Sequence, residues 1–454
     1  MGFSYPARTL CPRHCFRVRG LSGLSEIQYD TCGLTTQESR VWQYAPAMAG
    51  TPPTPRRRVR RLRRRRAWTA FGAALLAVVA GFVVVAEARI TGDAIEQRTL
   101  AAFYEQPADA TDGAPGTIVR SEELVGVPFD ARAWRVMYRA TDVHGTPAVS
   151  TGIVVTPAGP APAGGRTVVS WGHPTTGAVA DCAPSRGFDP YELIEGMRLL
   201  LDRGYTIAAT DYVGMGTDGP DSYLVGDTGG NAVLDAVRAA QHLPAAHASN
   251  DVVLWGHSQG GQAELFAAQR APQYAPELTV RGVAVAAPAA DLTALLSDHI
   301  NDISGVTIGS YAFASYSTVY ADRGATLESI LSPTALKILP EMNGLCLLPD
   351  IDRLHRIGDP AVGHFVTADP ARVEPWSGIL AENSAGADAF AAPLFVAQGL
   401  ADKLVVPSAT EQFVAHERGL GMDVEFHEIG EADHGTVAYL ALPALMAWLD
   451  AHRL

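Results

Sequence analysis

The feature that most constrains the fold of this chain is a five-residue turn between an apolar run and a helical pattern. The apolar run at residues 251–256 leads into Gly256-His257-Ser258-Gln259-Gly260, and helically spaced apolar residues follow at 259–270. Glycines on both sides of a serine permit a sharp strand-to-helix turn that projects the hydroxyl above the edge of a sheet. A purely structural Gly-Ser turn is the alternative, but the strand–turn–helix context predicts Ser258 as a nucleophile.

Strand and helix patterns alternate along most of the chain. Two early strands without an intervening helix, followed by strand–helix alternation, predict an α/β fold with a mostly parallel central sheet flanked by helices. Eight strands are predicted, at residues 133–141, 150–157, 166–172, 205–211, 251–256, 281–287, 393–399 and 424–430. Five helices are predicted between and after them, at residues 190–204, 231–243, 259–270, 408–420 and 436–454.

This alternation is interrupted between residues 293 and 385, where helical spacing prevails and no clear core strand is present. An insertion of this size between two core strands predicts a helical cap or lid. The core is then divided into a first part at residues 89–292 and a second part at 386–454.

A serine hydroxyl is a weak nucleophile, so it needs a base, and the base needs an acid that orients it. Asp402 follows the strand at 393–399, and His434 follows the strand at 424–430. The chain order Ser258, Asp402, His434 is the order expected in this architecture.

Other candidates for base and acid fit the pattern less well. His427 and His416 fall inside a strand and a helix, and the side chain of His257 should point away from its neighbour Ser258. Asp433 is the main rival for the acid, but adjacent residues rarely orient each other's side chains, which favours Asp402.

Two groups are expected to stabilise the oxyanion of an acyl-transfer reaction. The Gln259 amide lies at the start of the helix after the nucleophile. The second donor should come from the loop after the strand at 166–172, where Pro174 has no amide hydrogen. The main chain of Thr175 or Thr176 is therefore expected, with a hydroxyl as a further option; these threonines could instead only shape the loop.

The N-terminal part of the chain differs sharply in charge from the remainder. Residues 1–66 hold 14 arginines against three acidic residues, although the whole chain has a net charge of −13. The acidic body argues against nucleic-acid binding. Arginines at 56–66 directly precede apolar residues 67–88, which predicts a signal peptide or a membrane anchor, and hence a secreted or membrane-anchored protein. Residues 1–66 are interpreted as a disordered or mis-assigned leader that includes the Arg-rich run.

Five cysteines are present, three of them in the leader. The spacing "CPRHC" offers too few ligands for a zinc site, so no metal is predicted. Cys182 and Cys346 in the body permit one pairing, and a disulfide is expected in an oxidising compartment. Two separate buried thiols are the alternative.

Four longer motifs resemble the secretory lipase family of the lipase A type: "SWGHPTTGAVADCAPS", "DYVGMGTDGPDSYLVGDTGGNAVLDAVRAA", "GHSQGG" and "AQGLADKLVVP…EADHGT". The resemblance covers roughly residues 120–454. It implies an α/β-hydrolase fold with a helical cap, a triad of Ser258, Asp402 and His434, and an oxyanion hole of Gln259 with Thr175 or Thr176. Fungal members have an Asp near the position of Thr176.

These observations predict an exported serine hydrolase of carboxylic esters, such as triacylglycerols, that needs no cofactor. A short-chain esterase or an acyltransferase with the same triad is the alternative. A serine peptidase, or an inactive surface-binding module, fits the sequence less well.

Overall fold

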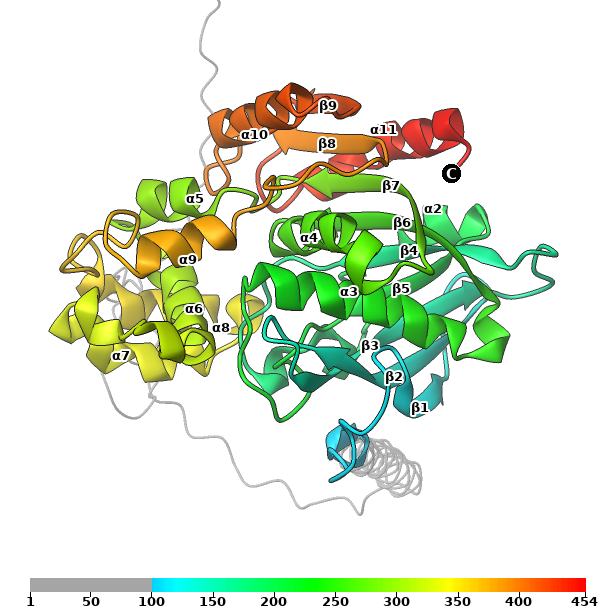
Figure 1. Ribbon diagram of the computed structural model, residues 1–454, viewed down its shortest axis with the longest axis horizontal. Coiled ribbons are helices and arrows are strands. Elements are labelled where there is room, and N and C mark those ends of the chain that lie inside the picture. The colour runs from blue at the N-terminus through cyan, green and yellow to red at the C-terminus, as the bar shows by residue number, and fades with distance from the viewer. Residues whose placement is uncertain (1–99) are drawn as a thin grey trace, which may run out of the picture. The chain divides into compact units, whose positions relative to one another are not determined.

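Nine strands form one sheet in residues 100–454, the part of the chain that the computed structural model describes (Figure 1). The order is β1-β2-β3-β5-β4-β6-β7-β8-β9; the pairs from β1 to β5 are antiparallel, and those from β5 to β9 are parallel. The strands are β1 (Ile118–Leu124), β2 (Ala131–Thr141), β3 (Pro147–Pro157), β4 (Arg166–Gly172), β5 (Thr206–Thr210), β6 (Ala248–His257), β7 (Thr279–Ala286), β8 (Leu394–Gly399) and β9 (Val424–Ile429).

All eight strands predicted from the sequence are present, and the predicted mostly parallel sheet is confirmed. Strand β1 was not predicted from the sequence. Its sequence, IVRSEEL, has no fully buried residue, because within residues 100–454 it forms the edge of the sheet and pairs only with β2. A polar edge strand of this kind resists edge-to-edge association but lacks the apolar run that marks a core strand.

Helices cover both faces of the sheet. Alternate residues of the core strands point to opposite faces of the sheet. One face packs against α3 (Gly226–Gln241), α4 (Gln259–Tyr274) and α10 (Pro407–Gly419). The other face packs against α2 (Met197–Asp202) and α11 (Val437–His452). Helix α2 is shorter than the predicted helix at 190–204, because Gly196 adopts φ 85° and separates α2 from the turns before it.

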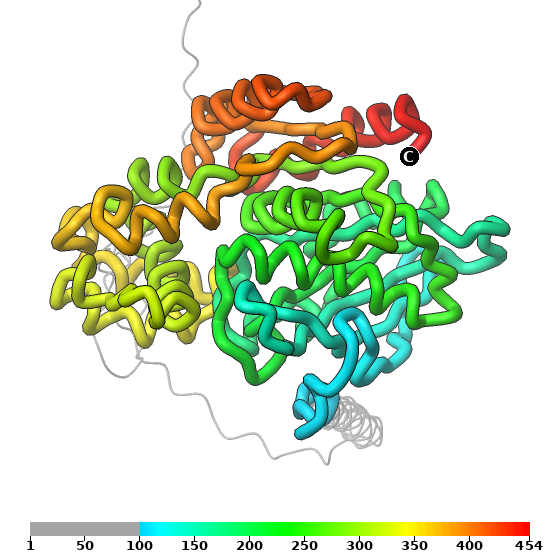
Figure 2. Tube along the Cα trace, viewed as in Figure 1, coloured from blue at the N-terminus to red at the C-terminus, as the bar shows by residue number. Residues whose placement is uncertain are grey.

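The stretch predicted as the cap, residues 293–385, is occupied by helices. They are α5 (Leu292–His299), α6 (Ile303–Val319), α7 (Pro333–Asn343), α8 (Leu347–Gly358) and α9 (Trp376–Glu382). This stretch supplies most of one apolar cluster, in which Phe313, Phe365 and Trp376 are fully buried, and Ala178 and Tyr223 of the remaining chain pack into the same cluster. They gather beyond the end of the sheet toward which β7 and β8 run (Figures 1 and 2). The division of the chain into a cap domain and a two-part core remains a prediction.

No helix among residues 100–454 combines the length and the apolar character needed to span a membrane. The predicted leader at residues 1–66 and the predicted signal peptide or anchor at 67–88 lie outside the described residues.

Candidate active site

Ser258 lies in the turn between β6 and α4. Its backbone angles are φ 56° and ψ −116°, a conformation that a residue with a side chain rarely adopts. Two main-chain hydrogen bonds to the end of β7 and the residues after it hold Ser258 in this conformation. The Ser258 amide donates to Ala286 O over 3.0 Å, and Ser258 O accepts from Ala289 N, also over 3.0 Å. Backbone strain maintained by surrounding bonds is typical of functional sites.

The glycines of the turn are required by close packing. A Cβ on Gly260 would lie 1.8 Å from the carbonyl oxygen of Gly172, the last residue of β4. A Cβ on Gly256 would lie 2.4 Å from the Gly260 carbonyl oxygen. The first turn of α4 therefore packs directly on the end of β4, and this contact leaves no space for a side chain.

The side chains of Ser258, His434 and Asp402 form a continuous hydrogen-bonded chain. His434 Nε2 lies 2.9 Å from Ser258 Oγ, and His434 Nδ1 lies 2.8 Å from Asp402 Oδ2. Asp402 Oδ1 accepts from the amides of Leu404 and Val405, which fixes the carboxylate. The sequence-predicted residues, 176 positions apart at the widest, thus meet at the carboxyl end of the sheet.

The loops that carry Asp402 and His434 are joined to each other. Leu400 and Ala401, after β8, donate main-chain hydrogen bonds to Ile429 O and Ala432 O, at the end of β9 and just beyond it. These bonds set the spacing between the acid and the base.

The rival candidates lie elsewhere. Asp433 is exposed, and its Oδ1 accepts a 2.6 Å hydrogen bond from the Thr436 hydroxyl. His427 Nε2 pairs with Glu425, and His416 Nε2 with the Gly386 carbonyl oxygen. None of the three takes part in the hydrogen-bonded chain at Ser258.

His257 is buried beside the site, with its ring centroid 5.0 Å from that of His434. Burial, together with the neighbouring His434, lowers the pKa of His257 to about 3. The ring is therefore neutral at physiological pH and packs against His434 without adding positive charge.

The predicted oxyanion residues have different surroundings. The Thr175 hydroxyl shares a 2.7 Å hydrogen bond with the Tyr223 hydroxyl, and the Thr176 hydroxyl donates to Met215 Sδ over 3.8 Å. Within residues 100–454, no hydrogen bond is donated by the main-chain amide of Thr175, Thr176 or Gln259. The hydroxyls are thus engaged, whereas these amides have no partner within the described chain.

Glu264 is a buried acidic residue of α4 that was not predicted from the sequence. It is fully buried on α4, and its Oε1 accepts a 2.8 Å hydrogen bond from the Ser170 hydroxyl of β4. Burial raises its pKa well above the ordinary value, which favours the uncharged acid. The sequence feature that could have indicated Glu264 is an acidic residue on the sheet-facing side of the predicted helix at 259–270.

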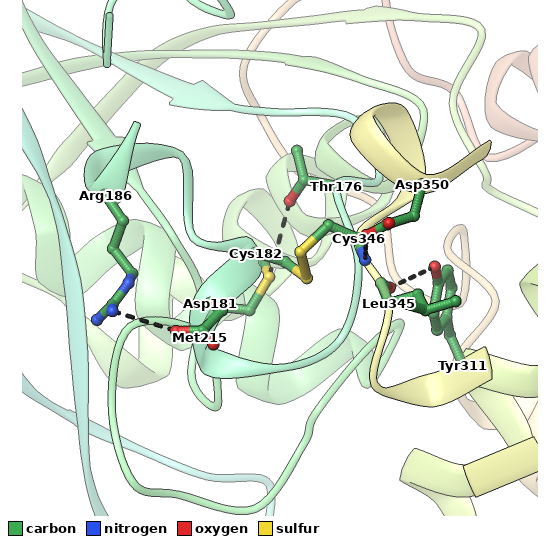
Figure 3. Close-up of a disulfide and its surroundings, with 9 residues drawn as sticks. All are labelled: Thr176, Asp181, Cys182, Arg186, Met215, Tyr311, Leu345, Cys346 and Asp350. Atoms are coloured by element: carbon green, nitrogen blue, oxygen red, sulfur yellow. Dashed lines mark hydrogen bonds and ion pairs between the residues drawn. A yellow bond between two sulfur atoms is a disulfide. The ribbon is translucent and has the colours of Figure 1, made fainter. Parts of the chain in front are cut away.

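Cys182 and Cys346 form a disulfide, as predicted (Figure 3). It joins the loop after β4 to the residue that precedes α8. Among residues 100–454, no group of three or more His, Cys, Asp or Glu side chains could hold a metal ion.

A hollow of about 660 Å³ lies between α2 and the first half of α11. Its lining includes Met197, Leu440 and Pro443, but none of the three side chains of the hydrogen-bonded chain. Ser258 itself is only 6% exposed.

Comparison with known proteins gives a consistent result. Residues 192–453, more than half of the chain, match the family model for secretory lipase. Lipase 5 of Candida albicans is 26% identical over 384 residues, 76% of this chain and 79% of the relative. A Mycobacterium tuberculosis protein whose name describes it as a probable inactive lipase is 24% identical over 373 residues, 76% of this chain and 80% of the relative.

Solved structures show the same fold. Candida antarctica lipase A in its closed state matches with a TM-score of 0.66 and 20% identity, over 77% of this chain and 85% of that one. The cell wall degrading esterase LipA of Xanthomonas oryzae matches with a TM-score of 0.61 and 22% identity, over 74% of this chain and 98% of that one. The predicted α/β-hydrolase fold and the predicted family are confirmed: the chain belongs to the secretory lipase family.

Proposed function

We propose that the protein is an exported serine hydrolase of carboxylic esters, with Ser258 as nucleophile, His434 as general base and Asp402 as the orienting acid. The observation that carries the proposal is the position of His434, which lies within hydrogen-bond distance of Ser258 on one side and Asp402 on the other. Membership of the secretory lipase family supports an ester or lipid substrate and export from the cell.

The reaction begins when the Ser258 hydroxyl attacks the ester carbonyl. His434 Nε2 takes the hydroxyl proton, and Asp402 Oδ2 accepts from Nδ1, which fixes the tautomer and stabilises the imidazolium that forms. The tetrahedral intermediate collapses when His434 returns this proton to the leaving alkoxide, leaving an acyl group on Ser258. His434 then activates a water molecule that releases the carboxylic acid.

The negative oxygen of the tetrahedral intermediate needs preorganised donors. We assign this role to the Gln259 amide, at the start of α4, and to a main-chain amide of Thr175 or Thr176. The main chain is favoured over the threonine hydroxyls, because the Thr175 hydroxyl is already bonded to Tyr223 and the Thr176 hydroxyl to Met215.

Triacylglycerols are the proposed substrates, and small esters are the alternative. The Candida albicans relatives are named lipases, whereas the Mycobacterium tuberculosis relative is named a probable inactive lipase. The complete Ser258–His434–Asp402 chain of hydrogen bonds favours an active enzyme over an inactive surface-binding module. Residues 67–88 are proposed to act as a signal peptide or membrane anchor.

The test is hydrolysis of p-nitrophenyl esters with acyl chains of two to sixteen carbons, by the full chain and its Ser258→Ala variant. Rates that rise toward long chains and vanish in the variant are expected for a lipase. Rates that peak at two to four carbons would keep the triad but make the protein a short-chain esterase. Equal rates for the two proteins would refute the assignment of Ser258.

A further inference from the structure

The loop after β4 carries Thr175 and Thr176 and ends at Cys182; residues 173–182 are called the oxyanion loop below. It has no regular secondary structure before the short 3₁₀ turn η1 (Ala180–Cys182). An oxyanion hole needs donors that are fixed before the reaction starts. The groups that fix this loop are therefore relevant to catalysis.

The hydrolase core binds the two ends of the oxyanion loop. At the first end, the Tyr212 hydroxyl donates to His173 O over 3.0 Å. At the second end, the Gly216 amide donates to Ala180 O over 3.0 Å. These two bonds come from the segment after β5, whose Met215 and Tyr223 also bind the Thr176 and Thr175 hydroxyls; the main chain in the middle of the loop has a different partner.

The middle of the loop is bound by the predicted cap. The Leu347 amide, at the start of α8, donates to Thr176 O over 2.7 Å. The preceding residue, Cys346, forms the disulfide with Cys182 (Figure 3). A covalent bond and a hydrogen bond thus join the loop to two consecutive cap residues.

Packing around the disulfide adds a steric constraint on the loop. Gly177 adopts φ 145°, and a Cβ there would lie 2.5 Å from Cys182 Sγ and 3.3 Å from Cys346 Cα. The residue after Thr176 is thus in direct contact with both halves of the disulfide, and this contact requires a glycine.

The attachment point within the cap is itself well supported. The Tyr311 hydroxyl, from α6, donates to Leu345 O over 2.8 Å, and the Cys346 amide donates to Asp350 Oδ2 over 3.3 Å (Figure 3). The ring of Tyr311 also contacts that of Tyr223 edge-on, at 5.5 Å between centroids, and Tyr223 is the partner of Thr175.

We propose that Cys346 and Leu347 of the cap are positioning residues for the oxyanion hole, acting through Cys182 and Thr176. The cap then has a part in catalysis, because it holds the main chain that carries the amides assigned to the oxyanion hole. This role rests on the proposed function. It implies that loss of the disulfide weakens stabilisation of the transition state more than substrate binding, and so lowers kcat more than it raises KM.

The experiment compares the full chain with its Cys182→Ala/Cys346→Ala double variant, using p-nitrophenyl butyrate at a temperature where circular dichroism shows both to be folded. We expect kcat to fall about 10- to 100-fold, somewhat less than the loss of a whole oxyanion donor, with KM changed less than about threefold. Leu445→Ala, in the buried face of α11 away from the loop, is the control for lost stability.

A second variant disturbs the loop but keeps the disulfide. Gly177→Ala should lower kcat selectively, as the double variant does, because its Cβ would displace Cys182 Sγ. Gly145→Ala is the matched control: Gly145 also has a positive φ, of 74°, but a Cβ there would meet no atom within 4 Å.

The outcomes separate this inference from the proposed function. An active full chain whose double variant keeps kcat within twofold would overturn the positioning role alone, whatever the result for Gly177→Ala. Equal falls in kcat for Leu445→Ala or Gly145→Ala would also overturn it, since general instability would then be the cause. A full chain without ester hydrolysis would overturn the proposed function, and this inference with it.

Discussion

Asp402 accepts hydrogen bonds from two main-chain amides and from His434, and its side chain is fully buried. We predict that Asp402→Asn lowers kcat by roughly 10⁴-fold, because the amide of asparagine stabilises the wrong tautomer of His434 and cannot balance the imidazolium charge. The matched control is Asp433→Asn, at an exposed carboxylate directly before His434 and four residues before Val437, the first residue of α11. Steady-state kinetics on a p-nitrophenyl ester would check both; a comparable loss in Asp433→Asn would contradict the choice of acid.

At the scale of residues, the three members of the hydrogen-bonded chain could be predicted, since each follows a core strand in a fixed chain order. The direction of the threonine hydroxyls could not. It depends on Tyr223 and Met215, which lie about 40 to 50 positions further along the chain and carry no motif for this contact. Glu264 was missed for a similar reason: its partner, Ser170, is 94 residues away.

Helix α4 depends on its contact with β4. Gly260→Ala would place a methyl group 1.8 Å from the Gly172 carbonyl oxygen, so the helix or the strand must move. We predict a loss of about 3 kcal/mol in the free energy of unfolding, together with loss of hydrolysis. Gly419→Ala, at the exposed end of α10 with no atom within 4 Å of the added Cβ, should change stability by less than about 1 kcal/mol. Urea denaturation would compare the two, and equal effects would refute the packing argument.

The segment between β5 and α3 contacts the cap through Asp221. Its carbonyl oxygen accepts from the Ser315 hydroxyl of α6, and its Oδ1 accepts from the Tyr223 amide, while Oδ2 is buried. Burial raises the pKa of Asp221 to about 7. Between about pH 4 and pH 7 the folded state therefore keeps the proton of this carboxyl group, whereas the unfolded state has lost it. The free energy of unfolding falls as the pH rises through this range.

We predict that Asp221→Asn removes this dependence. Relative to the wild type, the variant should gain roughly 2–4 kcal/mol of unfolding free energy between pH 4 and pH 8. Denaturation at the two pH values measures the difference. A constant difference between the two proteins would show that Asp221 has an ordinary pKa.

At the scale of elements, the apolar runs were sufficient to predict eight of the nine strands in residues 100–454, and the polar edge strand β1 was missed. The ends of α2 were predicted less well, because Gly196 at φ 85° interrupts a helical pattern that continues in the sequence. A pattern of apolar spacing records which residues face the core, but not where the backbone leaves the helical conformation.

At the scale of the whole molecule, strand–helix alternation predicted the sheet and the position of the helical insertion. It could not predict which cap residues contact which loop, because the insertion contains no recognisable motif. The pairing of Cys182 with Cys346 could be predicted, since the body of the chain offers only these two cysteines. That the pair brings Leu347 to the Thr176 carbonyl oxygen emerges only from the three-dimensional arrangement.

The decisive question is whether Ser258 is an activated nucleophile, since one relative with a similar sequence is named a probable inactive lipase. Incubation of the full chain with a fluorophosphonate, followed by mass spectrometry of its peptides, would answer it. We predict one label per chain, on Ser258, with ester hydrolysis lost in proportion and labelling strongly slowed in His434→Ala. A folded wild-type chain that stays unlabelled at Ser258 would contradict the assignment of this residue as the nucleophile of a serine hydrolase.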